Sequence, residues 1–267
     1  SGGNACSGAI PVCDKYQTYN TPDIGILTAS GTYPSCFDFA VNQDIWYQFT
    51  VTQTGILEWE ATPLGAGIEL DWAIYDITSG CPGALVACNY NYTGGASGPA
   101  GMITGSTCPG GVACPLAGPF GTGNLAPDIP CGEYCAPITV FAGNTYVIMI
   151  DNYTNTLNTG LDFAFGSGMT ALIEPVVNYS ISPNTVTCGS SVTVTITDNS
   201  LGTPVWNFGN GNTFTGNNPP SQTYSSPGTY AITATITDPS GCTSLQTEYV
   251  NLYAPLAATQ TQIDESC

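Results

Sequence analysis

The hexapeptide WNFGNG, residues 206–211, decides the fold of the C-terminal part of this chain. Trp206 and Phe208 have the two-residue spacing of side chains on one face of a β-strand, which predicts that both enter a hydrophobic core. Gly209 and Gly211 suit the turn that follows, because such a turn requires positive φ angles. The two asparagines favour Asx turns. The hexapeptide is therefore predicted to be a strand and a tight turn, a folding signature rather than a binding site.

Working outward, the same two-residue period recurs in four longer runs. They are DIWYQFTV (44–51), NTYVIMID (144–151), SVTVTITD (191–198) and TYAITATITD (229–238). The side chains predicted to face inward are Ile45, Tyr47, Phe49, Val51, Tyr146, Ile148, Ile150, Val192, Val194, Ile196, Tyr230, Ile232, Ala234 and Ile236. Gly, Pro and Asn separate the runs, and no convincing amphipathic helix is found. The pattern predicts an all-β protein made of antiparallel β-sandwiches with threonine-rich solvent faces.

The charge balance excludes several classes of partner. One Lys and no Arg stand against 19 acidic residues, a net charge of −18, and only 7% of the 267 residues are charged. Nucleic-acid binding needs basic side chains that neutralise phosphates, and anionic membrane surfaces need the same. No apolar run approaches the roughly 20 residues of a membrane-spanning helix. We therefore expect neither nucleic-acid binding nor direct membrane insertion.

The twelve cysteines, in a chain without histidine, indicate disulfides rather than zinc. Disulfides persist in oxidising compartments, which predicts an exported, extracellular protein. Six cysteines bracket short loops, namely Cys81 and Cys88, Cys108 and Cys114, and Cys131 and Cys135. Which cysteine pairs with which does not follow from their spacing.

Composition divides the chain into three parts. Residues 1–174 are predicted to form a cysteine-rich β-sandwich in which a long Gly/Pro stretch, residues 93–123, folds as a flap over an edge of the sandwich. Residues 175–255 are predicted to form a second, shorter sandwich. Residues 256–267 show strand-like alternation and are expected to begin a further repeat or a linker.

The second unit closely resembles a PKD domain, an immunoglobulin-like sandwich. Besides the hexapeptide, the resemblance rests on Tyr224, on PGTY at residues 227–230 and on the strand AITATITD that follows. Asn replaces the acids of the family pattern at positions 207 and 210, which would weaken any cation site there. The resemblance also implies a disulfide between Cys188 and Cys242. Such a bond would close a loop of about 54 residues and stabilise the fold by roughly 4 kcal/mol.

The first unit resembles the CUB-like and pre-peptidase C-terminal β-sandwiches of secreted Bacteroidota proteins. The resemblance rests, in order, on ACSGAIPVC, NQDIWYQFTVTQTGILEWEATP, LDWAIYDITSGCPGALVAC and FAGNTYVIMIDNYT. Modules of these two kinds occur together in large surface proteins exported by the type IX secretion system, including gliding-motility adhesins. The resemblance implies a non-catalytic, disulfide-stapled stalk or filament module of a bacterial cell-surface adhesin. An accessory region of a secreted hydrolase that binds carbohydrate or protein is the alternative.

Catalysis has little support in the sequence. A serine or cysteine protease mechanism needs histidine, and phosphoryl transfer needs basic clamps. Glu58 and Glu60 share one face of a strand, and their Cα atoms should lie about 6.6 Å apart, a separation that a glycosidase could use. Acidic residues on a solvent face are nevertheless common, so we expect no enzyme activity.

Two binding sites are conceivable in the first unit. Glu69, Asp71, Asp76 and Asp151 lie near strand ends and could ligate calcium, the one cofactor considered, although Asp71 and Asp76 fall on opposite faces by parity. Aromatic side chains could instead stack on sugar rings, although aromatics in a sandwich are more often core. These are Trp46, Trp59 and Trp72, with Tyr90, Tyr92 and Tyr153. The expected partners are neighbouring modules of the same long chain, surface polysaccharide or other surface proteins.

Overall fold

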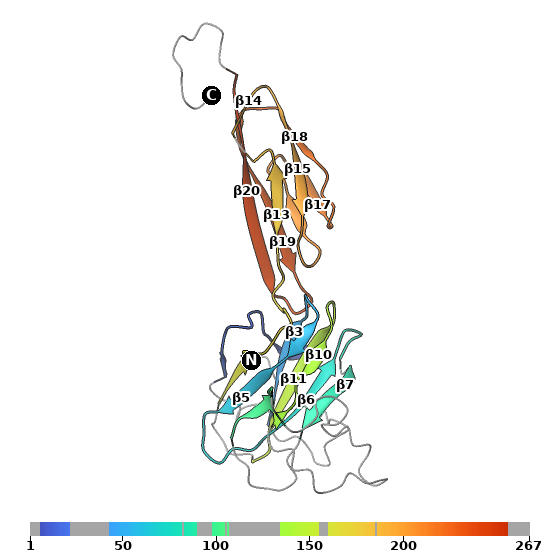
Figure 1. Ribbon diagram of the computed structural model, residues 1–267, viewed down its shortest axis with the longest axis vertical. Helices are drawn as coiled ribbons and strands as arrows, with labels where there is room; N and C mark the ends of the chain where they lie inside the picture. The colour runs from blue at the N-terminus through green and yellow to red at the C-terminus, as the bar shows by residue number, and fades with distance from the viewer. Residues whose placement is uncertain are drawn as a thin grey trace. The chain divides into compact units, whose positions relative to one another are not determined.

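The computed structural model (Figure 1) describes residues 6–21, 43–81, 83–89, 98–104, 106, 134–154, 160–184 and 186–255. The chain forms two compact units, Ser1–Glu174 and Pro175–Cys267. Within the described residues every regular element is a β-strand, apart from one 3-10 turn, η1 (Cys6–Gly8). The all-β prediction is confirmed. None of the described segments forms a helix with the length and apolar character needed to span a membrane.

The first unit is a β-sandwich with an added two-stranded ribbon. Its strands are β1 (Ile10–Pro11), β2 (Tyr19–Thr21), β3 (Asp44–Thr50), β4 (Gly55–Leu57), β5 (Trp59–Pro63), β6 (Leu70–Asp76), β7 (Ala84–Asn89), β8 (Ala100–Met102), β9 (Tyr134–Cys135), β10 (Ile138–Val140), β11 (Thr145–Asn152) and β12 (Leu161–Phe165). One sheet has the order β1-β3-β11-β6-β7 and the other β2-β12-β5-β8-β9, while β10 pairs with β4.

The core of the first unit lies between these two sheets. The alternating inward side chains of β3 and β11 enter it, as the sequence predicts. Contacts between the sheets are largely aromatic, since Tyr47 of β3 stacks on Phe163 of β12 with ring centroids 4.5 Å apart. Trp59 of β5 meets Trp72 of β6 edge to face at 5.2 Å.

Part of the Gly/Pro stretch of the first unit forms a β-strand rather than a flap. Ala100–Met102 form strand β8, which pairs with β5 inside the second sheet. Gly101 permits this close pairing, because an added Cβ would lie 2.2 Å from the carbonyl oxygen of Trp59. The flap prediction is therefore wrong for these residues, and most of the remaining stretch lies outside the described residues.

The second unit is a smaller sandwich. Its strands are β13 (Tyr179–Ser182), β14 (Thr187–Cys188), β15 (Val192–Asp198), β16 (Val205–Asn207), β17 (Thr213–Thr215), β18 (Gln222–Tyr224), β19 (Gly228–Thr237) and β20 (Thr243–Tyr253). Sheet β13-β15-β18 faces sheet β14-β20-β19-β16-β17 (Figure 1). Trp206, Phe208 and Tyr224 fill the core between them, all at most 1% exposed. The region 256–267, predicted to begin a further repeat, lies outside the described residues.

Candidate functional sites

The hexapeptide forms the strand and turn that its sequence predicts. The Trp206 side chain is buried, and its indole Nε1 donates a hydrogen bond to the carbonyl oxygen of Gly216 at 2.9 Å. The Asn207 side chain accepts from the amide of Gly209 at 3.0 Å, which is an Asx turn. Gly209 and Gly211 have φ angles of 73° and 93°. These residues shape a turn, and their polar atoms are used within it.

A row of buried carboxylates crosses three strands of the first unit. Asp151 of β11 is the register partner of both Asp44 of β3 and Asp71 of β6. Their exposures are 0%, 0% and 1%. The indole of Trp46 donates to Asp44 Oδ2 at 2.6 Å, and the amide of Gln43 donates to Asp151 Oδ1 at 2.9 Å. Hydrogen bonds of this kind offset part of the cost of burying neighbouring acids.

The predicted calcium ligands do not form one set. Asp71 and Asp151 are neighbours, and Glu69 lies two residues before Asp71, buried so that the pKa of its carboxyl is raised. Asp76 lies at the opposite end of β6, where it pairs with Tyr146, so its inclusion is wrong. Among the described residues, no three potential ligands converge to hold a metal ion. Sequence reasoning missed Asp44, although it is the acid that opens the run DIWYQFTV.

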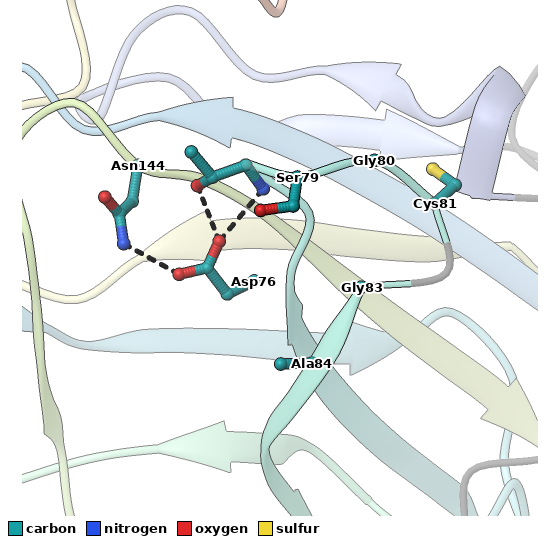
Figure 2. Close-up of a pocket in the computed structure, with 8 residues that line it drawn as sticks. Asp76, Ser79, Gly80, Cys81, Gly83, Ala84 and Asn144 are labelled. Atoms are coloured by element: carbon teal, nitrogen blue, oxygen red, sulfur yellow. Dashed lines mark hydrogen bonds between the residues drawn. The ribbon is translucent and has the colours of Figure 1, made fainter.

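Asp76 instead secures the turn after β6 (Figure 2). Its Oδ1 accepts from the amide of Thr78 at 2.9 Å and from the Thr78 hydroxyl at 2.5 Å, and its Oδ2 accepts from Asn144 Nδ2 at 2.7 Å. Burial alone would raise the pKa of this carboxyl, but these donors outweigh it and hold the pKa below its ordinary value.

The Asp76 carboxylate borders an open depression of about 690 Å³. The depression is lined by Asp76, Thr78, Ser79, Gly80, Cys81, Gly83, Ala84 and Asn144. Among the described residues of this lining there is no aromatic ring and no second acid, and both Asp76 oxygens already accept hydrogen bonds. The depression therefore provides neither an acid–base pair nor a stacking surface.

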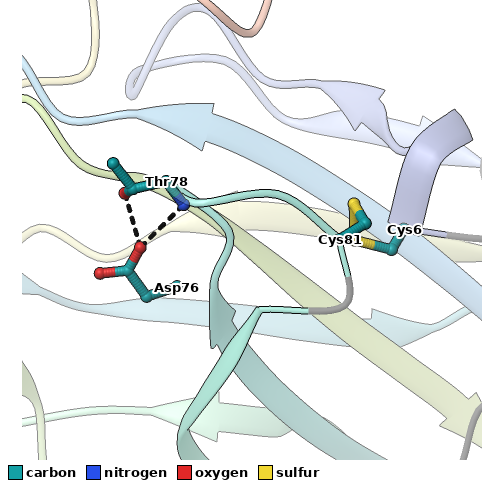
Figure 3. The surroundings of a disulfide bond; sticks show 4 residues. All are labelled: Cys6, Asp76, Thr78 and Cys81. Atoms are coloured by element: carbon teal, nitrogen blue, oxygen red, sulfur yellow. Dashed lines mark hydrogen bonds between the residues drawn. A yellow bond between two sulfur atoms is a disulfide. The ribbon is translucent and has the colours of Figure 1, made fainter.

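A disulfide adjoins this turn (Figure 3). Cys6 of η1 and Cys81 are joined with a Cα–Cα distance of 5.8 Å across 75 residues of sequence. The bond ties the N-terminal segment to the connection between β6 and β7. Cys13, Cys88 and Cys135 are also disulfide-bonded. These bonds confirm disulfide use, whereas Cys108, Cys114 and Cys131 lie outside the described residues.

The predicted Cys188–Cys242 pairing is wrong. Both residues are disulfide-bonded. Cys188 of β14 pairs in register with Tyr253 at the end of β20, whereas Cys242 immediately precedes Thr243 at its start. Ten residues of extended strand separate these positions by about 33 Å. A disulfide requires a Cα–Cα distance below about 7 Å, so each cysteine has another partner.

The two glutamates considered for catalysis have structural roles. Glu58 Oε1 accepts from the amide of Thr104 at 2.6 Å, and its Oε2 accepts from the amide of Gly168. Burial would raise the pKa of Glu58, but these bonds hold it below the ordinary value. Glu60 Oε2 accepts from the Tyr134 hydroxyl at 2.7 Å. Each carboxylate thus joins segments distant in sequence.

The prediction that three tryptophans stack on sugar rings is wrong, because none of these side chains is accessible. Trp46, Trp59 and Trp72 are each 0% exposed. Trp59 and Trp72 belong to the core between the sheets, and Trp46 packs on the other face of the first sheet, against Tyr75. Tyr153 is 45% exposed, and Tyr90 and Tyr92 lie outside the described residues.

Sequence reasoning missed an accessible face on the second unit. On β19 and β20 the residues whose side chains point away from the core include Leu245, Tyr249 and Tyr253, which are 62%, 58% and 44% exposed. Threonines surround them, and Val205 of β16 adds a side chain that is 53% exposed. The signal was available in the alternation of TSLQTEYVNLY, residues 243–253, where the outward positions are Thr, Leu, Tyr and Asn.

Comparison with known proteins identifies the second unit. Residues 173–252 match the family model described as the PKD domain. This part of the chain belongs to the PKD family, and the chain thus contains a PKD domain. No curated protein shows a significant match.

Several solved structures are similar to this chain, among them the following three. The PKD1 domain of Vibrio anguillarum Epp is 30% identical, covering 30% of this chain and 95% of that domain, with a TM-score of 0.23. The PKD1 domain of the Vibrio cholerae metalloprotease PrtV is 27% identical, covering 29% and 95%, with a TM-score of 0.22. The amphioxus IgVJ-C2 molecule is 16% identical, covering 76% and 98%, with a TM-score of 0.22.

The family match and the disulfides agree on the class of protein. PKD domains are non-catalytic modules typical of extracellular surface or secreted proteins. Disulfide bonds in the first unit fit the same environment.

Proposed function

We propose that this chain is a non-catalytic part of a large exported bacterial surface adhesin, in which disulfide-stapled β-sandwiches serve as structural and adhesive modules. The PKD domain carries the proposal, because it is a module of extracellular proteins with no chemistry of its own. The Cys6–Cys81 bond supports a role outside the cell, where a sandwich must persist without chaperones. Its partners would be neighbouring modules of the same chain and the surface that the cell contacts.

The resemblance of the first unit supports the finer proposal that export uses the type IX system of a gliding bacterium of the Bacteroidota. In this view each sandwich is a spacer that carries a binding face away from the cell. An accessory region of a secreted hydrolase is the competing assignment, because PKD modules of either kind of protein would have the same fold.

Surface labelling tests the proposal directly. An antibody raised against the chain should label intact cells, and brief protease treatment of whole cells should remove the label. Deleting the gene segment should reduce attachment of cells to a surface. Release of the chain into the medium, on the same polypeptide as a hydrolase activity, would favour the accessory region. Retention inside the cell would reject both assignments.

A further inference from the structure

The outer face of the β19–β20 sheet is an ordered hydroxyl array with regularly placed apolar side chains. Two rows run straight across four strands, Thr215–Val205–Thr235–Leu245 and Thr213–Asn207–Thr233–Thr247. Hydrogen bonds between neighbours fix the polar groups. Thr233 and Thr247 hydroxyls lie 3.2 Å apart, and Thr229 donates to Asn251 Oδ1 at 2.8 Å.

Along β20 the large side chains recur every four residues. Leu245, Tyr249 and Tyr253 share this face, so successive members are about 13 Å apart and the strip extends over about 27 Å. Thr247 and Asn251 lie between them. The strip is linear, and its residues stand on paired strands rather than on loops, so its geometry is preorganised.

The face carries no charge. None of the described outward residues of β16, β17, β19 and β20 is Asp, Glu, Lys or Arg. These described residues therefore offer no side chain that could form an ion pair with a ligand. The net charge of −18 on the chain also repels an anionic ligand at long range. A protein partner would instead favour a contiguous apolar centre, whereas here single apolar side chains are spaced among hydroxyls.

From these observations we infer that the β19–β20 face binds a linear, uncharged polysaccharide. The Tyr249 and Tyr253 rings offer apolar surfaces to the C–H faces of sugar rings, at low entropic cost because tyrosine has few rotatable bonds. The flanking Thr and Asn side chains exchange hydrogen bonds with sugar hydroxyls. This inference rests on the proposed surface function and gives it a ligand class and a site.

Depletion on insoluble polysaccharides tests the inference with the full chain. Amorphous cellulose, chitin and curdlan serve as neutral probes and calcium alginate beads as the anionic one. We expect retention on at least one neutral probe and none on alginate. Retention on alginate equal to that on the neutral probes, or failure of all three neutral probes, would overturn the inference.

Matched variants locate the site. Tyr249→Ala and Tyr253→Ala should each weaken retention about tenfold, the usual loss for an aromatic anchor. Tyr249→Phe should retain binding because it keeps the ring. Tyr16→Ala, at a tyrosine of the first unit that is 85% exposed, is the control and should change nothing. Unchanged retention in the Tyr249→Ala/Tyr253→Ala double variant would refute the site.

Two further readouts separate the alternatives. Sedimentation of the chain alone should give a monomer, whereas a dimer that the double variant dissociates would show a self-association face and overturn the inference. Cells labelled at the surface by antibody while the chain binds no polysaccharide would refute this inference alone. Failure of the antibody to label intact cells that have not been treated with protease would refute the proposed function.

Discussion

Adding one methyl group at either glycine of the WNFGNG turn should reveal what each contributes. Gly209 and Gly211 both have positive φ angles, 73° and 93°. Their surroundings differ, since a Cβ on Gly209 would lie 2.6 Å from the carbonyl oxygen of Ala231, while one on Gly211 would meet nothing within 4 Å. The pair therefore separates backbone strain from steric clash.

The expected magnitudes follow from these contacts. Gly211→Ala should cost about 1–2 kcal/mol, the strain of an L-residue in the left-handed region. Gly209→Ala carries the same strain and must also displace strand β19, because the clashing atom is backbone and cannot rotate away. Overpacking adds about 1–3 kcal/mol, for a total of about 2–5 kcal/mol.

Hydrogen exchange of β19 amides measures the two costs in the second unit itself. Where exchange requires global opening of the unit, each 1.4 kcal/mol lost accelerates it about tenfold. Amides of Ile232 and Ala234, which are buried in the core, should exchange about tenfold faster in Gly209→Ala than in Gly211→Ala. Equal rates in the two variants would refute the steric argument, and unchanged rates in Gly211→Ala would refute the strain argument.

Three further predictions concern one buried acid, Glu58, and the disulfides. Glu58→Gln should destabilise the first unit by about 1–3 kcal/mol at pH 7, because a charged acceptor of two amides is lost. The pKa of Glu58 is lowered in the fold, so the stability that its carboxylate contributes is present above the ordinary pKa and fades as pH falls through the folded pKa. Urea titrations of wild type and variant should therefore show a smaller difference in unfolding free energy at pH 3 than at pH 7. A difference that is constant with pH would contradict this. The Cys6→Ser/Cys81→Ser variant, which removes this one bond, should lose up to about 4 kcal/mol of stability from the loop of 75 residues. Denaturant unfolding measures the loss, and an unchanged midpoint would show that the bond constrains little. Non-reducing peptide mapping should recover Cys188 and Cys242 in separate disulfide-linked pairs, and a peptide joining the two would show that the β14–β20 register is wrong.

Much of the fold was accessible from alternation and turn chemistry. Thr193, Thr195 and Thr197 point to solvent while Val192, Val194 and Ile196 are buried, because a strand with one wet face must alternate. The Asx turn at Asn207 likewise follows from local chemistry. Long-range pairings are a different kind of information. The Cys188–Cys242 prediction failed because the sequence does not give the length or the register of the strands beside the two cysteines. Strand β20 runs for eleven residues between their positions.

The sites were harder to predict because alternation identifies two faces of a strand without saying what covers each. What separates a covered face from an exposed one is the kind of side chain at the outward positions. In β3, Trp46 and Asp44 occupy the face away from the inter-sheet core, and both are completely buried, so this face is covered as well. In β19 the outward positions are mostly threonine, which leaves the face polar enough to remain in water. A tryptophan on a strand whose two faces are both buried therefore indicates a side chain that packs inside the protein. Tyrosines spaced along a threonine-rich face, as at Tyr249 and Tyr253, indicate a surface that can hold a ligand.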